Sequence, residues 1–506
     1  MAAKKVRVRF APSPTGPLHM GGVRTALYNY LFAKNQGGDF LLRIEDTDQT
    51  RFVEGAEAYI IESLKWCGIE PDEGVGFGGD HGPYRQSERG DIYKQWIQVL
   101  LDSGNAYYAF DTPEEIAGKR EAAEQEKAVW QYDASTRHEM RNSESLPDSE
   151  VQELLQSGAP ATVRFKMPES EDVVFDDAIR GTVTINTKVL DDKVLMKSDG
   201  LPTYHFANVV DDHLMEISHV IRGEEWLPSA PLHNLLYRAF DWTPPTFAHL
   251  PLILKPTGSG KLSKRDGDKG GFPVFPLDWK DPKTDSTSPG YRESGYFPEA
   301  FINMLLMLGW NPGTEQEIFS LEEMVAQFSL ERVVKSGARF NPDKAKWFNE
   351  HYLRAHSPED LGQLLLPILK EKGREVSSEQ AVQIAEMFAE RSSFVKDLAQ
   401  ADYLFEAPEE YNAKALKKKW KEGTSANMKK LSEMLSGVEK WDAESIEVEF
   451  KSFLEREELG LGAILPNFRN VLTGEGGGPS MFAIAAFIGK EETVNRIETG
   501  LTRIDK

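Results

Sequence analysis

The chain opens with alternating apolar and basic residues and then changes to helical spacing. Val6, Val8 and Phe10 alternate with basic residues, a period of two that predicts a strand. Apolar residues between Val23 and Leu31 recur at helical spacing until Gly37-Gly38 ends the run. A loop rich in proline and glycine lies between the two patterns. This order of strand, loop and helix is typical of the first unit of a nucleotide-binding sheet.

The pattern changes twice further along the chain. After a second predicted strand at Phe40–Ile44, residues 87–202 contain two helical stretches followed by short strand-like pieces. Strand and helix patterns resume until about residue 298, and from there nearly every apolar stretch has helical spacing. The predicted fold class is therefore α/β, with a Rossmann-like nucleotide-binding domain, an α/β insertion and an all-α C-terminal region.

The loop between the first strand and helix has features of a nucleotide site. Three prolines from Pro12 to Pro17 fix φ and stiffen it. Gly21 and Gly22 lack Cβ at the helix entry, where unpaired N–H groups attract an anion. His19 precedes them as a candidate donor to a phosphate oxygen. Taken alone, these residues also fit a proline-rich turn with a surface histidine, which is the commoner structure.

A second stretch, Lys261-Leu262-Ser263-Lys264-Arg265, places three cations on a loop flanked by glycines. Such a loop suits a mobile clamp that stabilises the charge of a leaving pyrophosphate, although a solvated basic loop is the commoner structure. It is not a Walker loop, because Leu262 stands where Ser or Thr must follow the lysine. The run Gly74–Gly79 formally matches a dinucleotide fingerprint, but its surroundings do not predict the strand and helix that this site requires.

Together, His19-Met20-Gly21-Gly22 and the Lys261–Arg265 loop resemble the two signature motifs of class I aminoacyl-tRNA synthetases. Longer stretches are similar to bacterial-type glutamyl-tRNA synthetases, in the right order and along nearly the whole chain. They are Ala11-Pro12-Ser13-Pro14-Thr15-Gly16, Arg43-Ile44-Glu45-Asp46-Thr47-Asp48, Gly82-Pro83-Tyr84-Arg85-Gln86-Ser87-Glu88-Arg89, Ser198-Asp199-Gly200-Leu201-Pro202-Thr203-Tyr204-His205 and Asn208-Val209-Val210-Asp211-Asp212-His213. The fourth position of the first motif is Gly22 where the class has a second histidine, which removes one phosphate donor.

The resemblance implies an ATP-dependent ligase that forms glutamyl-adenylate and transfers glutamate to the 3′ end of tRNA(Glu). It implies a glutamate pocket made of Arg9, Ser13, Glu45, Tyr204, Asn208 and Arg222. It implies an ATP site, with Mg²⁺ accompanying ATP, made of His19, Gly21, Gly22, Glu225, Trp226, Lys261, Ser263, Lys264 and Arg265. His19, Lys261 and Lys264 would be the catalytic residues, and Arg391 would contact the anticodon loop.

The resemblance also implies five consecutive segments. Residues 1–86 and 203–254 would form the two halves of the catalytic domain, and 87–202 the inserted domain that grips the tRNA acceptor end. Residues 255–355 would form a stem-contact domain carrying the basic loop, and 356–506 a helical anticodon-binding region. Residues Asp266–Gly290 exceed the usual family pattern, and their role is open.

Composition narrows the remaining choices. The single Cys67 leaves no cysteines for a disulfide framework or for the zinc site that some relatives carry, so no structural zinc is expected. No apolar stretch predicts a signal peptide or a membrane span, and we expect a cytoplasmic monomer. The net charge of −22 is a weak argument against nucleic-acid binding, because a nucleic acid contacts one face of a protein and not its average charge. The lysine-rich stretch Lys414–Lys421 is a candidate for such a basic face.

Three other functions fit parts of the pattern. A glutaminyl-tRNA synthetase would end in β-barrels, whereas this C-terminus has helical spacing. A non-catalytic RNA-binding paralogue would be expected to lack His19 or Lys264, and both are present. A nucleotidyltransferase, or a shorter relative that charges a modified base, would not need the helical C-terminal residues. Whether tRNA(Gln) is also charged, and whether activation requires bound tRNA, stays open at this point.

Overall fold

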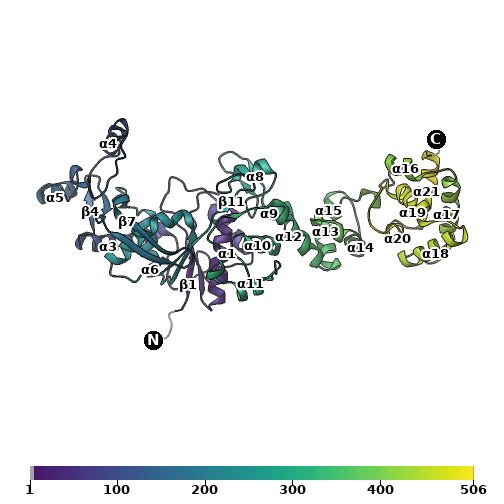
Figure 1. The fold of residues 1–506 in the computed structure, drawn as a ribbon, viewed down its shortest axis with the longest axis horizontal. Helices are drawn as coiled ribbons and strands as arrows, with labels where there is room; N and C mark the ends of the chain where they lie inside the picture. Colours follow the sequence, from purple (N-terminus) through teal and green to yellow (C-terminus); the bar gives the residue numbers. More distant parts are fainter. Residues whose placement is uncertain (1–4, 505–506) are drawn as a thin grey trace. The chain divides into compact units, whose positions relative to one another are not determined.

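The computed structural model describes residues 5–504, which fall into two compact units, Met1–Ala345 and Lys346–Lys506. The first unit is mixed α/β and the second is helical, as the sequence predicts (Figure 1). Each unit is described by itself below.

A parallel three-stranded sheet begins the first unit, with strand order β1 (Arg7–Phe10), β2 (Asp39–Leu42) and β3 (Glu73–Gly74). Helix α1 (Met20–Asn35) connects β1 to β2 and buries Val23, Leu27 and Leu31 against them. Helix α2 (Ala56–Trp66) leads to β3. The two-residue β3 includes Gly74, but no helix opens after the Gly74–Gly79 run, so this run is a loop, as the sequence analysis concluded.

A second sheet continues the nucleotide-binding fold, in the order β7 (Gly181–Asn186), β6 (Asp172–Asp177), β10 (Thr246–Leu250) and β9 (His219–Gly223). It adjoins the first sheet, because Ser218 donates its backbone N–H to the carbonyl of Arg7. Helices α6 (Tyr204–Leu214) and α7 (Ala230–Ala239) pack together beside these strands. The β6–β7 hairpin lies inside the predicted insertion 87–202, yet its parallel bridge to β10 joins it to the nucleotide-binding sheet.

The rest of the 87–202 segment builds its own small layer. A three-stranded antiparallel sheet runs β4 (Ala106–Ala109), β5 (Thr162–Phe165) and β8 (Val194–Met196). Helices α3 (Gly90–Asp102), α4 (Pro113–Gln125) and α5 (Asp148–Gln156) accompany it (Figure 1). Its core carries a buried ion pair in which Arg137 Nη2 lies 2.8 Å from Asp192 Oδ1.

After β10 the chain forms short strands and helices around the site. The strands are β11 (Ile253–Leu254), β12 (Trp279–Lys280), β13 (Thr287–Ser288) and β14 (Ala338–Arg339). The helices are α8 (Lys264–Gly270), α9 (Tyr291–Ser294), α10 (Pro298–Met307) and α11 (Leu321–Gln327). The segment Asp266–Gly290 therefore contains most of α8 and the β12–β13 hairpin.

Helix α12 (Pro342–Ala355) carries the division between the units, and only helices follow it within the described residues. They are α13 (Pro358–Glu371), α14 (Ser378–Phe388), α15 (Val395–Leu398), α16 (Ala413–Lys419), α17 (Thr424–Ser436), α18 (Ala443–Arg456), α19 (Leu461–Thr473), α20 (Met481–Ile488) and α21 (Lys490–Ile504). Within residues 5–504, no helix combines the length and apolar character needed to cross a bilayer.

Candidate active site

A cavity of about 860 Å³ lies at the carboxyl ends of β1, β2 and β9, where open α/β sheets bind their ligands. Most of the residues that the sequence assigned to glutamate or ATP line it. They are Arg9, Ser13, His19, Gly21, Gly22, Glu45, Tyr204, Asn208, Arg222, Glu225, Trp226 and Lys261. Side chains separated by more than two hundred positions in the sequence therefore share one cavity.

A buried ionic network forms the floor of this cavity. Arg9 donates from Nε and Nη2 to the two carboxylate oxygens of Asp212, at 2.9 and 3.2 Å. Arg43, which is fully buried, reaches Asp212 at 2.7 Å and Glu45 at 3.0 Å. Asn208 donates its side-chain amide to the same Glu45 oxygen, at 3.2 Å. These bonds fix the Glu45 carboxylate and leave Arg9 Nη1 available toward the cavity.

The network continues through the neighbouring carboxylate, Asp211. Arg89 donates from Nε to Asp211 at 2.7 Å, and Gln86 and Tyr93 donate to the other oxygen of that carboxylate. Counting Arg9, Arg43 and Arg89 against Glu45, Asp211 and Asp212 gives three positive and three negative groups. Buried charges are tolerated when they are compensated in this way. Burial nevertheless raises the pKa of Glu45, although Arg43 and Arg9 act against the shift.

Arg222 is held differently from Arg9 and Arg43. It is only 4% exposed, and within the described residues it makes no ion pair with a carboxylate. Its partners are neutral: Nε bonds His249 Nε2 at 3.1 Å, and Nη1 lies 3.2 Å from both Tyr204 Oη and His233 Nδ1. The ring of Trp226 packs on Tyr204, with centroids 4.2 Å apart. Arg222 therefore presents a positive charge to the cavity, and no carboxylate of residues 5–504 contacts its guanidinium.

His19 caps the N-terminus of α1. Its Nδ1 accepts the backbone N–H of Gly21 at 3.2 Å, so the proton of the neutral ring sits on Nε2. Burial, together with the charge of Lys261, lowers the pKa of His19 to about 4, and the ring is neutral at physiological pH. Its Nε2 is buried and has no hydrogen-bond partner among the described residues. Because buried donors need partners, this N–H is suited to an oxygen of a bound ligand.

The two glycines of the first motif keep the cavity open beside His19. A Cβ built on Gly22 would lie 2.5 Å from Leu18 Cδ1, so a side chain at this position would require the Leu18 side chain to shift. Gly21 has room for a Cβ, 3.6 Å from His19 Nδ1. Space beside the backbone is therefore tighter at Gly22 than at Gly21.

The basic loop contributes to the cavity unevenly. Lys261 lines it and pairs with Glu225, Nζ to Oε1 at 2.7 Å, and Leu262 also lines it. Ser263 caps α8 and donates its hydroxyl to Asp266 at 2.5 Å. Lys264 and Arg265 are exposed in the first turn of α8 and do not line the cavity. In this conformation the structure brings Lys261 to the site but not Ser263, Lys264 or Arg265.

The chain that follows the basic loop contacts the first motif. Val274 accepts the backbone N–H of Met20 at 2.8 Å, and the ring of Phe275 packs edge-on against His19. Tyr59 of α2 anchors the next residues, since its hydroxyl donates to the Leu277 carbonyl at 2.5 Å and accepts the Leu277 N–H. This part of the Asp266–Gly290 segment is therefore packed into the catalytic unit and supports the entry of α1.

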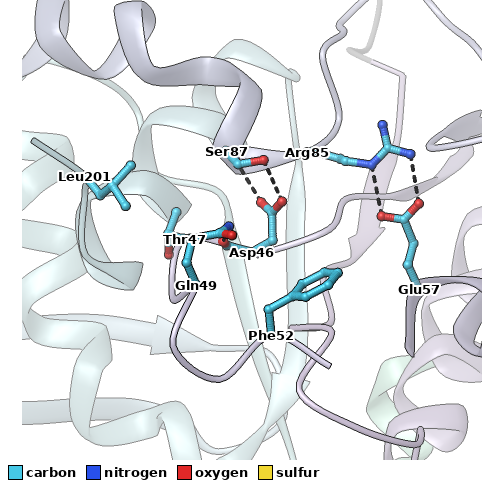
Figure 2. A pocket seen from close by; sticks show the side chains of 8 residues that line it. All are labelled: Asp46, Thr47, Gln49, Phe52, Glu57, Arg85, Ser87 and Leu201. Atoms are coloured by element: carbon cyan, nitrogen blue, oxygen red, sulfur yellow. Dashed lines mark hydrogen bonds and ion pairs between the residues drawn. The ribbon is translucent and has the colours of Figure 1, made fainter. Parts of the chain in front are cut away.

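A smaller pocket of about 400 Å³ lies beside the cavity, next to the loop that follows β2 (Figure 2). Its polar groups are paired with one another. Asp46 accepts the backbone N–H and the hydroxyl of Ser87, and Arg85 forms a two-pronged ion pair with Glu57 (Figure 2). Unlike Arg222, Arg85 is therefore paired with a carboxylate.

Two further assignments concern groups outside the cavity. Arg391 lies in the second unit, in the single 3₁₀ turn Ala389–Arg391, and its side chain is exposed. Among the described residues, no group of three His, Cys, Asp or Glu side chains has an arrangement that would hold a metal ion.

The sequence analysis assigned no role to Arg43, His233 or His249. Arg43 lies in a quoted motif and could have been found there, whereas the two histidines meet Arg222 only through the fold.

This constellation, a Rossmann-like sheet with His19 at the helix entry and a basic loop across the cavity, defines a class I aminoacyl-tRNA synthetase. Residues 5–347 match the family model "tRNA synthetases class I (E and Q), catalytic domain", and residues 360–501 match "Anticodon binding domain". Enzymes of this class use ATP together with Mg²⁺.

Comparison with individual proteins narrows the class. The chain is 59% identical to the glutamate–tRNA ligase of Phocaeicola vulgatus over 98% of both chains, and 55% identical to that of Porphyromonas gingivalis over 99% of both. A crystal structure of a glutamate tRNA ligase from Elizabethkingia meningosepticum, in complex with its amino acid, superposes with a TM-score of 0.96 at 53% identity and covers 99% of each chain. The chain belongs to the glutamate–tRNA ligase family.

Proposed function

We propose that the chain activates L-glutamate with ATP and transfers it to the terminal ribose of tRNA(Glu), releasing pyrophosphate and AMP. In the first step the glutamate carboxylate attacks the α-phosphate, and in the second the ribose hydroxyl attacks the acyl carbon. The observation that carries the proposal is the convergence of Arg9, Arg222, Glu45 and His19 on one cavity in a chain of this family. Such a site acts by positioning its substrates and stabilising charge.

The charges of the cavity match those of glutamate. Arg9 and Arg222 would bind its two carboxylates, since a guanidinium fork suits a carboxylate. Glu45, held by Arg43 and Asn208, would accept the α-ammonium group. Ser13 and Tyr204 would complete the pocket. Glutamine would leave Arg222 facing a neutral amide, and the loss of a buried charged partner discriminates strongly.

The opposite part of the cavity would receive ATP with its Mg²⁺. His19 would donate its Nε2–H to a phosphate oxygen, and Gly21 and Gly22 would let the nucleotide approach the entry of α1. Glu225 and Trp226 would lie near the ribose and base. Lys261 would exchange its bond with Glu225 for a phosphate, and a movement of α8 would bring Ser263, Lys264 and Arg265 onto the polyphosphate.

The tRNA would contact both units. We assign its acceptor end to residues 87–202, its stem to 255–355 and its anticodon loop to the helical residues 356–506, with Arg391 among the anticodon contacts. The exposed lysines Lys414, Lys417 and Lys418 on α16 form a basic surface suited to phosphates. We further propose a cytoplasmic monomer that needs no structural zinc.

ATP–pyrophosphate exchange tests this function most directly, with glutamate or glutamine, each with and without tRNA(Glu). We expect exchange with glutamate and none above background with glutamine, because of the charge of Arg222. Exchange with glutamine would contradict the pocket assignment. Absence of exchange under every condition would contradict the enzymatic function, and exchange with glutamate only when tRNA is present would show that activation is tRNA-dependent.

A further inference from the structure

Two histidines on different elements hold Arg222 from opposite sides. His249, on β10, is fully buried, and His233, on α7, is 1% exposed. Arg222 donates from Nε to His249 Nε2 and from Nη1 to His233 Nδ1, at 3.1 and 3.2 Å. A guanidinium has only donors, so each of these ring nitrogens must carry a lone pair and no proton. The position of Arg222 thus depends on the tautomer of both rings.

A carboxylate sets the tautomer of His249. Asp177, at the end of β6, lies 2.5 Å from His249 Nδ1 and is itself 3% exposed. Its other oxygen accepts the backbone N–H groups of Ile179 and Arg180, which fixes its orientation. Because Asp177 accepts a proton from Nδ1, Nε2 is left bare toward Arg222. Both hydrogen bonds therefore point the same way: Arg222 donates to His249, and His249 donates to Asp177.

The second ring is set in a similar way by a third histidine. His233 Nδ1 faces Arg222, so its proton lies on Nε2, which is 3.2 Å from His205 Nδ1. Burial lowers the pKa of all three histidines, to about 4 for His205, and the charge of Arg222 acts in the same direction. Arg222 is the charged group that all three rings share. His249 also faces Asp177 and Arg180, and His233 also faces Arg9. His205 also faces Lys193 and Asp191.

Neutral acceptors have an effect that carboxylates would not have. Asp212 holds Arg9 and compensates its charge, so Arg9 attracts a further anion less strongly. His249 and His233 hold Arg222 through neutral rings, so no carboxylate of the described residues contacts its guanidinium and more of its positive charge is left for the ligand. Resting on the function proposed above, we infer that Asp177, His249 and His233 are positioning residues that fix Arg222 without a carboxylate in contact with its guanidinium and thereby support the selection of glutamate over glutamine.

The substitution Asp177→Asn tests this inference with little change in shape. Asn keeps the oxygen that accepts the two backbone N–H groups and turns an N–H₂ group toward His249 Nδ1. His249 would then accept there and carry its proton on Nε2, which would place an N–H against the N–H of Arg222. We expect the KM for glutamate in ATP–pyrophosphate exchange to rise about 10- to 100-fold, the range for losing a hydrogen bond to a charged group, with the KM for ATP changed less than about 3-fold.

Two variants of His249 separate positioning from simple packing. In His249→Gln the amide oxygen replaces Nε2 as acceptor for Arg222, and the amide N–H₂ can face Asp177. In His249→Asn the shorter side chain loses contact with Arg222. We expect His249→Gln to stay within about 5-fold of wild type in glutamate KM, and His249→Asn to match Asp177→Asn. The preference for glutamate over glutamine should fall little in His249→Gln and more in His249→Asn and Asp177→Asn.

The buried acid Asp192 provides a control: like Asp177 it accepts side-chain and backbone hydrogen bonds, but its side-chain partners are Arg137 and Tyr107 and it lies in the β4–β5–β8 layer. Asp192→Asn should leave the glutamate KM unchanged. The inference is overturned if Asp177→Asn leaves the glutamate KM unchanged, if it raises the KM for ATP equally, or if Asp192→Asn has the same effect. Failure of the proposed function would look different, because the wild-type chain would then show no glutamate-dependent exchange.

Discussion

Replacing Arg43 with methionine would unbalance the buried network under the glutamate pocket. Arg43 is fully buried and compensates Asp212 at 2.7 Å and Glu45 at 3.0 Å. Its removal leaves three carboxylates against two guanidiniums. Methionine fills much of the space, so the main cost is the uncompensated charge, and breaking a buried pair in this way costs about 3–5 kcal/mol.

The folded variant can reduce this cost by taking up a proton. Burial already raises the pKa of Glu45 with Arg43 present, and loss of Arg43 removes the largest opposing interaction. The folded variant would then bind a proton at a pH where the unfolded chain does not. The stability of the variant relative to the wild type should therefore rise as the pH falls from 8 toward 5, by up to about 1.4 kcal/mol per pH unit.

Amide hydrogen exchange of α6 and β2, measured at increasing urea concentrations, gives the free energy of unfolding of the catalytic unit alone. Because the intrinsic exchange rate changes with pH, each rate is divided by the rate of the unfolded chain at the same pH. Arg137→Met is the control, because it removes a buried arginine paired with Asp192 at 2.8 Å away from the cavity. It should cost similar stability in β5 and leave the glutamate KM unchanged. A loss below about 1 kcal/mol for Arg43→Met at pH 8, or a loss independent of pH, would refute the reasoning.

Two further results should follow from the site. Lys264→Ala should lower the rate of adenylate formation about 10²–10³-fold with little change in glutamate KM, because a phosphate clamp acts on the transition state. Wild-type activity of this variant in pyrophosphate exchange would show that Lys264 does not have that role. The pKa of His19 and of His205 is lowered to about 4 from 6.5, so between these values the unfolded chain binds more protons than the folded one. Stability should fall as the pH drops from 6.5 to 4, and a flat urea midpoint over this window would contradict the neutral histidines.

Much of the fold was predictable from local sequence. Alternation at Val6, Val8 and Phe10 gave the first strand, and helical spacing after Val23 gave the helix that follows it. These signals are local, since they depend on the spacing of apolar residues within one element. The long helical run after residue 298 was predictable for the same reason, and it identified the C-terminal region as all-α. The alternation did not predict the burial of β1 on both faces, where Arg7 and Arg9 pair with Glu73 and Asp212.

Long-range pairing was not predictable. Nothing in Asp172–Asp177 indicates that this strand joins β10 in addition to its hairpin partner β7, because distant strand partners are chosen by the whole fold. The environment of Arg222 depends on the same pairing, since Asp177 reaches His249 across it. Motif resemblance indicated Arg222 as a ligand for glutamate, but it carried no information on the neutral rings that hold it.

The geometry of the cavity has a consequence for how the chain folds as it is synthesised. Arg9 pairs with a residue 203 positions later, Met20 bonds Val274, and Arg24 bonds a carbonyl 284 positions later. The first motif therefore lacks its partners until about 310 residues have emerged, which takes about 15–60 s at ordinary translation rates. During that time Arg9, Met20 and Arg24 lack these partners, so the start of this chain is where we expect chaperone contact to be longest.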